Sequence, residues 1–357
     1  MKKASEIVIE HYGQPDSALS VTVGDGRVLQ VLIYRPIEEE ELYETWFITA
    51  GLSAVLSLAG IKSVEICLDI HGSMSPESET EMATIFAKEM HAVLQDNAPA
   101  ANQLLSSVNL SPYFNTTAGI LVSVDLDQLV YLDNEGTTSV LQFFPIFIKE
   151  LDELEQIPPG FRNRTLILSK INWFDSSRSA ENILVKTLTN EWNKVMSWYK
   201  ENAPNLLSGL KPGQTSEELN MLEENLNFSI PSDLRVFLSL HNGGLTLHQY
   251  TLLSTDEIFT YHINVKDEIK KHSFLHADDK YYWPANAVPF AGDFKMSVIG
   301  VRQPIDKTED NVFLFNHSYG YSNTKWSCFL HWLHDYAFSL QKGMFVLDET
   351  GKILLPV

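Results

Sequence analysis

The chain has 357 residues and a hydrophobic content of 44%. At roughly 100–200 residues per domain, this length predicts two domains, and the hydrophobic content is too high for a disordered chain. The formal charge is −20, from 26 Lys and Arg against 46 Asp and Glu. A negative field of this size repels nucleic acid and anionic membranes and attracts basic partners. The same charge is also compatible with a role in solubility alone.

Cysteine usage and hydropathy indicate the compartment. Cys67 and Cys328 lie far apart in the sequence, which predicts no disulfide framework and is typical of a reducing compartment. Acidic residues interrupt the N-terminal region from Glu6 onward, so it does not have the pattern of a signal peptide. The longest uncharged run, residues 45–61, is shorter than the roughly 20 apolar residues that a membrane span needs. We therefore expect a cytoplasmic protein.

The first part of the chain is predicted to alternate strands with a helix. Residues 21–23 and 28–34 predict a hairpin, because the glycines between them allow a tight turn. Residues 63–70 alternate apolar and polar side chains, which predicts a strand. A helix is predicted from Pro76, because proline suits the first helical turn and an apolar helical stripe follows. Further strands are predicted at residues 119–124, 128–132, 139–144 and 165–171.

A long helix is predicted over residues 180–199, where apolar side chains recur at steps of three and four. It either closes the first domain or bridges the two domains. We place the first domain at residues 1–178, a linking helix at 179–204 and the second domain at 205–357.

The second part opens with helix signals. Thr215 and Glu218 have the spacing of a capping box, and a second helix is predicted from Pro231. Residues 242–244 end that helix, because glycine tolerates the left-handed conformation. The remaining predicted elements are strands near 288–290, 296–301 and 312–316, a helix over 327–340, and a hairpin of 344–347 with 352–355.

Motifs that carry chemistry are not found in the sequence. It has no phosphate-binding loop, no dinucleotide-binding fingerprint and no nucleophile elbow. The best metal candidate is Cys328 with His331 and His334, because steps of three partly share a helix face and these ligands suit zinc. Aromatic residues surround them, which favours a packed helix instead. We predict no catalytic residue, no metal site and no cofactor.

Acidic and aromatic segments are the candidate contacts for a protein partner. Tyrosine provides a large contact area with few rotatable bonds and is enriched at interfaces. An acidic run can contact a basic partner, although it is usually a solvated loop or a helix start. The candidates are Asp278, Asp279, Tyr281, Tyr282, Tyr319, Tyr321, Glu38, Glu39 and Glu40.

The second part resembles the SUKH superfamily, also called Smi/Knr-like. The resemblance rests on Leu-Lys-Pro-Gly at 210–213, the helix signals at 216–226 and 230–238, and His-Asn-Gly-Gly at 241–244. It covers roughly residues 205–357.

The first part resembles the Suppressor of fused domain over roughly residues 15–175. The matching segments are Thr-Ala-Gly-Leu-Ser at 49–53, Val-Glu-Ile-Cys-Leu at 64–68 and the apolar strand at 140–146.

The two resemblances imply an α+β fold for each domain, with a mixed or antiparallel sheet packed against helices. In bacteria both families are thought to supply immunity proteins of polymorphic toxin systems, and the SUKH type often acts against nuclease toxins. Neither family brings a catalytic motif. The resemblances therefore imply a non-catalytic bacterial immunity protein that binds a toxin with a basic surface.

The charge agrees with that expectation, because an acidic inhibitor is steered to the basic surface by which a nuclease holds phosphate. We expect no nucleic-acid or membrane partner, and the sequence leaves the oligomeric state open. A regulatory scaffold without a toxin partner is the alternative, and an enzyme with an unrecognised pocket is a third.

Overall fold

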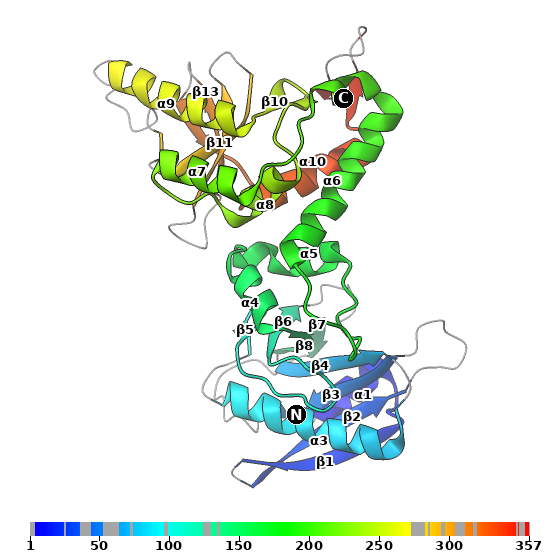
Figure 1. The fold of residues 1–357 in the computed structure, drawn as a ribbon. Helices are drawn as coiled ribbons and strands as arrows, with labels where there is room; N and C mark the ends of the chain where they lie inside the picture. Colours follow the sequence, from blue (N-terminus) through cyan, green and yellow to red (C-terminus); the bar gives the residue numbers. More distant parts are fainter. Residues whose placement is uncertain are drawn as a thin grey trace. The chain divides into compact units, whose positions relative to one another are not determined.

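The computed structural model describes the chain except residues 1–3, 25, 36–43, 53–63, 72–73, 96–98, 124–129, 134–135, 273–282, 285, 294–296, 304–310, 317–319, 348, 350–353 and 357. Figure 1 shows its helices and strands. The chain forms two compact units. The first consists of Met1–Glu155 with Ile171–Glu181, and the second consists of Gln156–Lys170 with Asn182–Val357. Sheets with helices in both units confirm the α+β class.

The first unit contains an eight-stranded sheet in the order β1-β2-β3-β4-β8-β6-β5, with β7 paired to β8. Neighbouring strands are antiparallel except β4 and β8, which are parallel, so the sheet is mixed. The strands are β1 (Ser17–Val23), β2 (Arg27–Tyr34), β3 (Glu44–Ala50), β4 (Val64–His71), β5 (Leu104–Leu105), β6 (Ala118–Ser123), β7 (Val130–Asp133) and β8 (Gly136–Ile146).

Helices cover both faces of this sheet. Helix α3 (Pro76–Leu94) packs on one face, where Phe86 lies in a core with Ile66 and Leu68. Helix α1 (Ala4–Tyr12) packs on the other face, where Val8 contacts a smaller cluster that includes Cys67. Successive side chains of a strand point to opposite faces, so β4 is buried on both sides. Helix α4 (Ile148–Glu155) follows β8.

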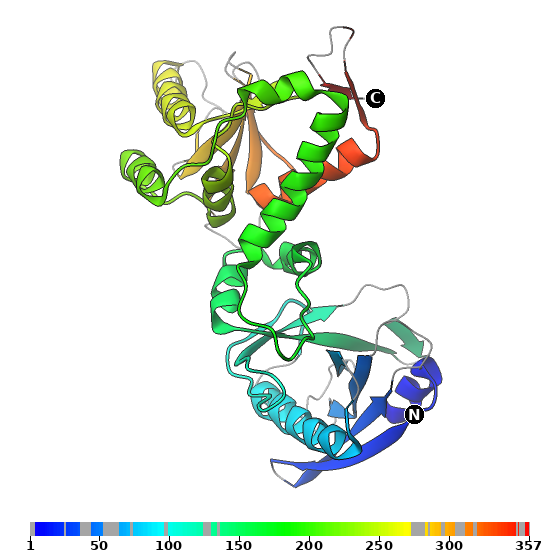
Figure 2. The same cartoon turned by 45° about the vertical axis from the view of Figure 1, so that its right-hand side comes forward.

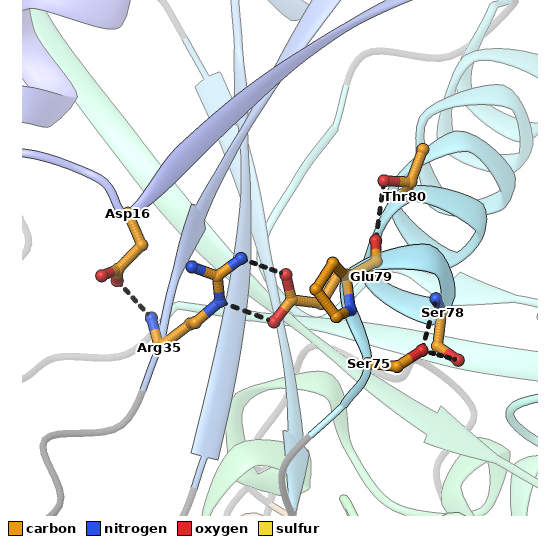
Figure 3. A network of polar contacts seen from close by, with 7 residues as sticks. Asp16, Arg35, Ser75, Ser78, Glu79 and Thr80 are labelled. Atoms are coloured by element: carbon orange, nitrogen blue, oxygen red, sulfur yellow. Dashed lines mark hydrogen bonds and ion pairs between the residues drawn. The ribbon is translucent and has the colours of Figure 1, made fainter.

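Polar contacts fix the start of α3 (Figure 3). The Ser75 hydroxyl caps the helix by accepting a hydrogen bond from the Ser78 N–H at 3.2 Å. Glu79, in the first turn, receives two hydrogen bonds from the Arg35 guanidinium, at 2.8 and 2.6 Å. The backbone N–H of Arg35 donates in turn to Asp16. The network therefore ties the end of β2 to the first turn of α3.

The second unit contains a six-stranded antiparallel sheet in the order β14-β13-β12-β11-β10-β9, and a separate pair of strands, β15 and β16. The strands are β9 (Thr246–Leu247), β10 (Tyr250–Leu252), β11 (Ala287–Gly292), β12 (Val298–Arg302), β13 (Val312–Asn316), β14 (Gly320–Asn323), β15 (Phe345–Leu347) and β16 (Leu354–Pro356). The helices are α5 (Pro159–Ser169), α6 (Ile183–Asn202), η1 (Pro204–Gly209), α7 (Ser216–Leu226), α8 (Ser232–Leu240), α9 (Thr255–His272) and α10 (Phe329–Gln341).

Helix α6 supplies much of the core of the second unit. It lies beside α10 in both views (Figures 1 and 2), and its Trp192 packs edge-on against Phe237 of α8. The hydroxyl of Tyr199 pairs with that of Tyr336 at 2.8 Å and donates to the Thr246 carbonyl. These contacts attach α6 to the sheet edge and to α10.

Most sequence predictions of elements are confirmed. The hairpin of β1 and β2, strand β4, helix α3 with proline in its first turn, and the terminal hairpin all form. The capping box of α7 forms with both of its hydrogen bonds. Helices α6, α8 and α10 and strands β6, β8, β11, β12 and β13 fall at or near the predicted positions.

The strand prediction for residues 165–171 is wrong, because this segment forms the end of α5. Phe161 and Leu168 pack into one core with Leu188 of α6. The Asn190 side chain of α6 donates to the carbonyls of Leu168 and Ser169, which closes the end of α5. Tertiary packing against α6 overrides the strand-like composition.

The division of the chain differs from the expected one. Helix α6, which the sequence placed in a link over residues 179–204, belongs to the second unit together with α5. The segment Ile171–Glu181 between these two helices belongs to the first unit. In the described part of the chain, no helix is long and apolar enough to cross a membrane.

Candidate functional site

The second unit carries a groove beside α10, with a volume of about 230 Å³. Small-molecule sites usually measure about 300–1,000 Å³, so this hollow matches a single side chain better than a drug-sized ligand. We call it the α10 groove. Its apolar walls come from β9, β10, β12, α10 and β15, and consist of Leu247, Tyr250, Ile299, Trp332, Tyr336 and Phe345.

The aromatic walls are held in place by the core behind them. Trp332 and Tyr336, one helical turn apart on α10, stack with ring centroids 5.8 Å apart and planes 5° apart. Trp332 also packs on Phe290 of β11, and Tyr336 contacts Phe345 of β15. Because these contacts already fix the two side chains, they lose little conformational entropy when a partner binds, which favours binding.

The polar side of the groove is built around Asp335. One carboxylate oxygen, Oδ2, accepts from the Trp326 indole N–H at 2.9 Å and pairs with the Lys325 ammonium at 2.7 Å. Burial would raise the pKa of Asp335, but the hydrogen bonds from Lys325 and Trp326 outweigh burial and lower it. The carboxylate is therefore ionised at neutral pH.

Other titratable side chains of the groove are neutral near pH 7. Burial lowers the pKa of His248, whose ring lies 5.9 Å from that of Phe345. Burial also raises the pKa of Tyr250, which keeps its phenol protonated. Lys325 and Asp335 are thus the charged residues among those that line the groove. The site offers aromatic surface beside a carboxylate that is paired with an exposed ammonium.

The three metal candidates are each engaged in contacts of the core. Cys328 is buried before the first turn of α10 and lies against Asp233, and burial raises the pKa of its thiol. The ring of His331 stacks on Phe161 at 4.6 Å. His334 Nδ1 lies 2.9 Å from an oxygen of the buried Glu191. Across the residues that the structure describes, no group of three or more His, Cys, Asp or Glu side chains could hold a metal ion.

His334 instead completes a buried polar contact with Glu191. Burial would raise the pKa of Glu191, but hydrogen bonds from His334 and Lys194 outweigh it and lower the pKa. Because Glu191 and Lys194 lie on α6 and His334 lies on α10, this cluster joins the two helices.

Of the predicted partner contacts, Tyr321 alone falls among the described residues. It lies on β14, and its ring stacks on Phe313 at 5.0 Å while its hydroxyl donates to Asn323. Tyr321 therefore packs against its own sheet and does not line the α10 groove. The other candidates, Asp278, Asp279, Tyr281, Tyr282, Tyr319, Glu38, Glu39 and Glu40, lie outside the described residues.

Sequence reasoning missed the groove because its aromatic residues have the spacing of a core helix. Trp332 is 5% exposed and is a core residue on its inner side. One feature of the sequence could have indicated the site. Asp335 is an acidic residue between the aromatic residues Trp332 and Tyr336. The residues of β9 and β15 that complete the groove are distant from α10 in the sequence, so local sequence patterns could not assign them to the same site.

Residues 213–335 match the model of the SMI1 / KNR4 family (SUKH-1). The second unit carries a SUKH-1 domain. Most of the groove, including Trp326, Trp332 and Asp335, lies within the matched residues.

A curated relative is named "Glucan synthesis regulatory protein" and comes from Neurospora crassa. It is 39% identical over 56 residues, which cover 16% of this chain and 10% of the relative. The aligned segment thus spans about a tenth of that protein's length.

Two solved structures of Suppressor of fused proteins are similar to this chain. "The Sufu-Fu complex crystal structure" is similar with a TM-score of 0.38 and 13% identity, over 53% of this chain and 96% of that chain. "Crystal structure of Drosophila Suppressor of Fused" has a TM-score of 0.34 and 11% identity, over 56% of this chain and 55% of that chain.

Proposed function

We propose that this protein is a non-catalytic immunity protein. It binds a protein toxin with a basic surface, with nucleases as the leading class, and blocks that surface. The α10 groove lies in the interface, and the protein works in the bacterial cytoplasm without a nucleic-acid or membrane partner.

The observation that supports the proposal most strongly is the α10 groove itself. An aromatic anchor site with a fixed carboxylate lies in the SUKH-1 domain of a chain that carries a charge of −20. Aromatic pockets at the centre of an interface contribute most of the binding free energy, and acidic surroundings raise the association rate with a basic partner. A nuclease presents a basic surface because it binds phosphate.

The test is a pull-down of the protein against the toxin domain encoded nearest its gene, followed by a nuclease assay at low and at physiological salt. We expect a stable complex, loss of nuclease activity, and slower association at the higher salt concentration because the charges are screened. A toxin that stays unbound and fully active would contradict the proposal. In that case a regulatory scaffold would become the better account.

A further inference from the structure

We propose that the α10 groove binds an arginine side chain of the basic partner. The identity of the partner rests on the proposed function, whereas the chemistry of the bound side chain is inferred from the groove alone.

The groove combines two features that a guanidinium requires. Aromatic side chains line it, and guanidinium groups stack on aromatic rings and are weakly hydrated. The Asp335 carboxylate lies among these side chains, and its Oδ2 is held by Trp326 and Lys325. The second oxygen, Oδ1, receives no hydrogen bond from the described residues, so a planar donor can pair with it.

Lys325 occupies the place of the arginine in the free protein. Its ammonium pairs with Asp335 and lies 6.0 Å from the centroid of the Trp326 ring, at the outer limit of a cation–π contact. The Lys325 side chain is 74% exposed. Because ion pairs that water reaches contribute little stability, a guanidinium can displace this ammonium at small cost.

Size and charge favour arginine over other occupants. The volume of about 230 Å³ fits one long side chain and not a drug-sized molecule. An acidic side chain is disfavoured by Asp335 and by the overall charge of −20. An uncharged aromatic side chain would cover Asp335 without pairing with it, which costs free energy. Lysine lacks the planar fork that stacks and pairs at the same time.

The probe is Nα-acetyl-arginine amide, titrated into the full-length protein. Binding is followed through the indole N–H signals in a ¹H–¹⁵N spectrum, where the seven tryptophans each give one signal. The substitution Trp326→Phe assigns the signal of Trp326. We expect that signal to shift saturably with the arginine probe, and not with Nα-acetyl-citrulline amide, which has the same shape and no charge.

Two substitutions test the pairing of the guanidinium with Asp335. Lys325→Met removes the competing ammonium and should lower the dissociation constant of the arginine probe by about two- to fivefold. Asp335→Asn keeps an acceptor for Trp326 but removes the charge, and should raise the dissociation constant by about tenfold or more. Equal shifts with arginine and citrulline probes, or weaker arginine binding in Lys325→Met, would overturn the inference.

The two proposals fail in different ways. If the arginine probe binds but the toxin is neither bound nor inhibited, the proposed function is wrong and the groove still recognises arginine. An inhibited toxin whose affinity does not change in either variant, with no shift by the probe, would retain the proposed function and reject arginine recognition by the groove.

Discussion

Each unit contains an ion pair between a carboxylate and a cationic side chain, and the two pairs differ in their access to water. In the first unit, Arg178 pairs with Glu150 at 2.6 Å, and the two side chains are 7% and 0% exposed. In the second unit, Lys325 pairs with Asp335 at 2.7 Å, and the side chains are 74% and 27% exposed. Similar distances therefore describe a buried contact in the first unit and a water-accessible contact in the second.

The buried pair holds several segments of the first unit together. Glu150 accepts from Arg178 and from the backbone N–H groups of Phe147 and Glu181. Arg178 also donates to the Pro145 carbonyl, and its guanidinium lies over the rings of Phe147 and Trp173. Removal of either partner leaves the other charge buried and unpaired. The stability lost on substitution is therefore expected to depend on the exposure of the pair and not on its distance.

The largest effect is expected from Arg178→Met. The substitution leaves the Glu150 carboxylate buried without its cation and should lower the free energy of unfolding by about 3–5 kcal/mol. Differential scanning calorimetry measures the loss. The control is Lys149→Met, an exposed cation on α4 beside Glu150, which should change stability by less than about 0.5 kcal/mol. Similar losses in the two variants would show that burial does not decide the cost.

Glu65 gives the next largest effect, as a dependence on pH. In the described chain its hydrogen bonds come from neutral donors, Thr49, Gly51 and Leu52, and burial outweighs them and raises its pKa from 4.5 to about 7. Because the pKa of Glu65 is higher in the folded state, its contribution to stability is complete below pH 4.5. That contribution is lost as the pH rises through about 7. The loss between these limits is about 3 kcal/mol.

Urea unfolding at pH 5 and pH 8 tests this, with Glu65→Gln as the variant that cannot titrate. The wild-type protein should lose more stability than the variant on going to pH 8. Equal losses in the two proteins would contradict the raised pKa. Glu77→Gln, an exposed residue on α3, serves as the control and should behave as the wild type does.

Arg35→Met tests an ion pair of intermediate exposure to water. The Arg35 side chain is 41% exposed while its partner Glu79 is 3% exposed. Two charge-assisted hydrogen bonds are lost, but water reaches the site, so we expect a loss of about 1–2 kcal/mol. The midpoint of urea unfolding for this variant should lie between the midpoints for Arg178→Met and Lys325→Met. Any other order would contradict the claim that the stability lost increases with the burial of the ion pair.

Lys325→Met should have the smallest effect on folding. The ion pair with Asp335 is open to water, so the free energy of unfolding should change by less than about 0.5 kcal/mol. Thermal unfolding checks this value. A loss of several kcal/mol would mean that the pair is structural, and the groove would then not be free to exchange its lysine for a partner's arginine.

Local sequence signals predicted the elements, and contacts between distant segments explain what they missed. Alternation in β4 and the capping box at Thr215 are complete within a few residues. The segment from Thr49 to Leu52, which supports the resemblance of the first part, binds the Glu65 carboxylate, a contact that the sequence does not show. The α10 groove likewise needs strands β9 and β15, which local patterns cannot assign to one site.

The most direct test of the account is the affinity of the toxin for wild-type protein, Asp335→Asn and Asp152→Asn. Both substitutions remove one negative charge, so they change the net charge of the protein equally. Asp335 lines the groove, whereas Asp152 is an exposed residue of α4 that does not line it. By isothermal titration calorimetry we predict at least about tenfold weaker binding for Asp335→Asn and less than about twofold for Asp152→Asn. Equal affinities of the two variants would contradict direct recognition by the groove.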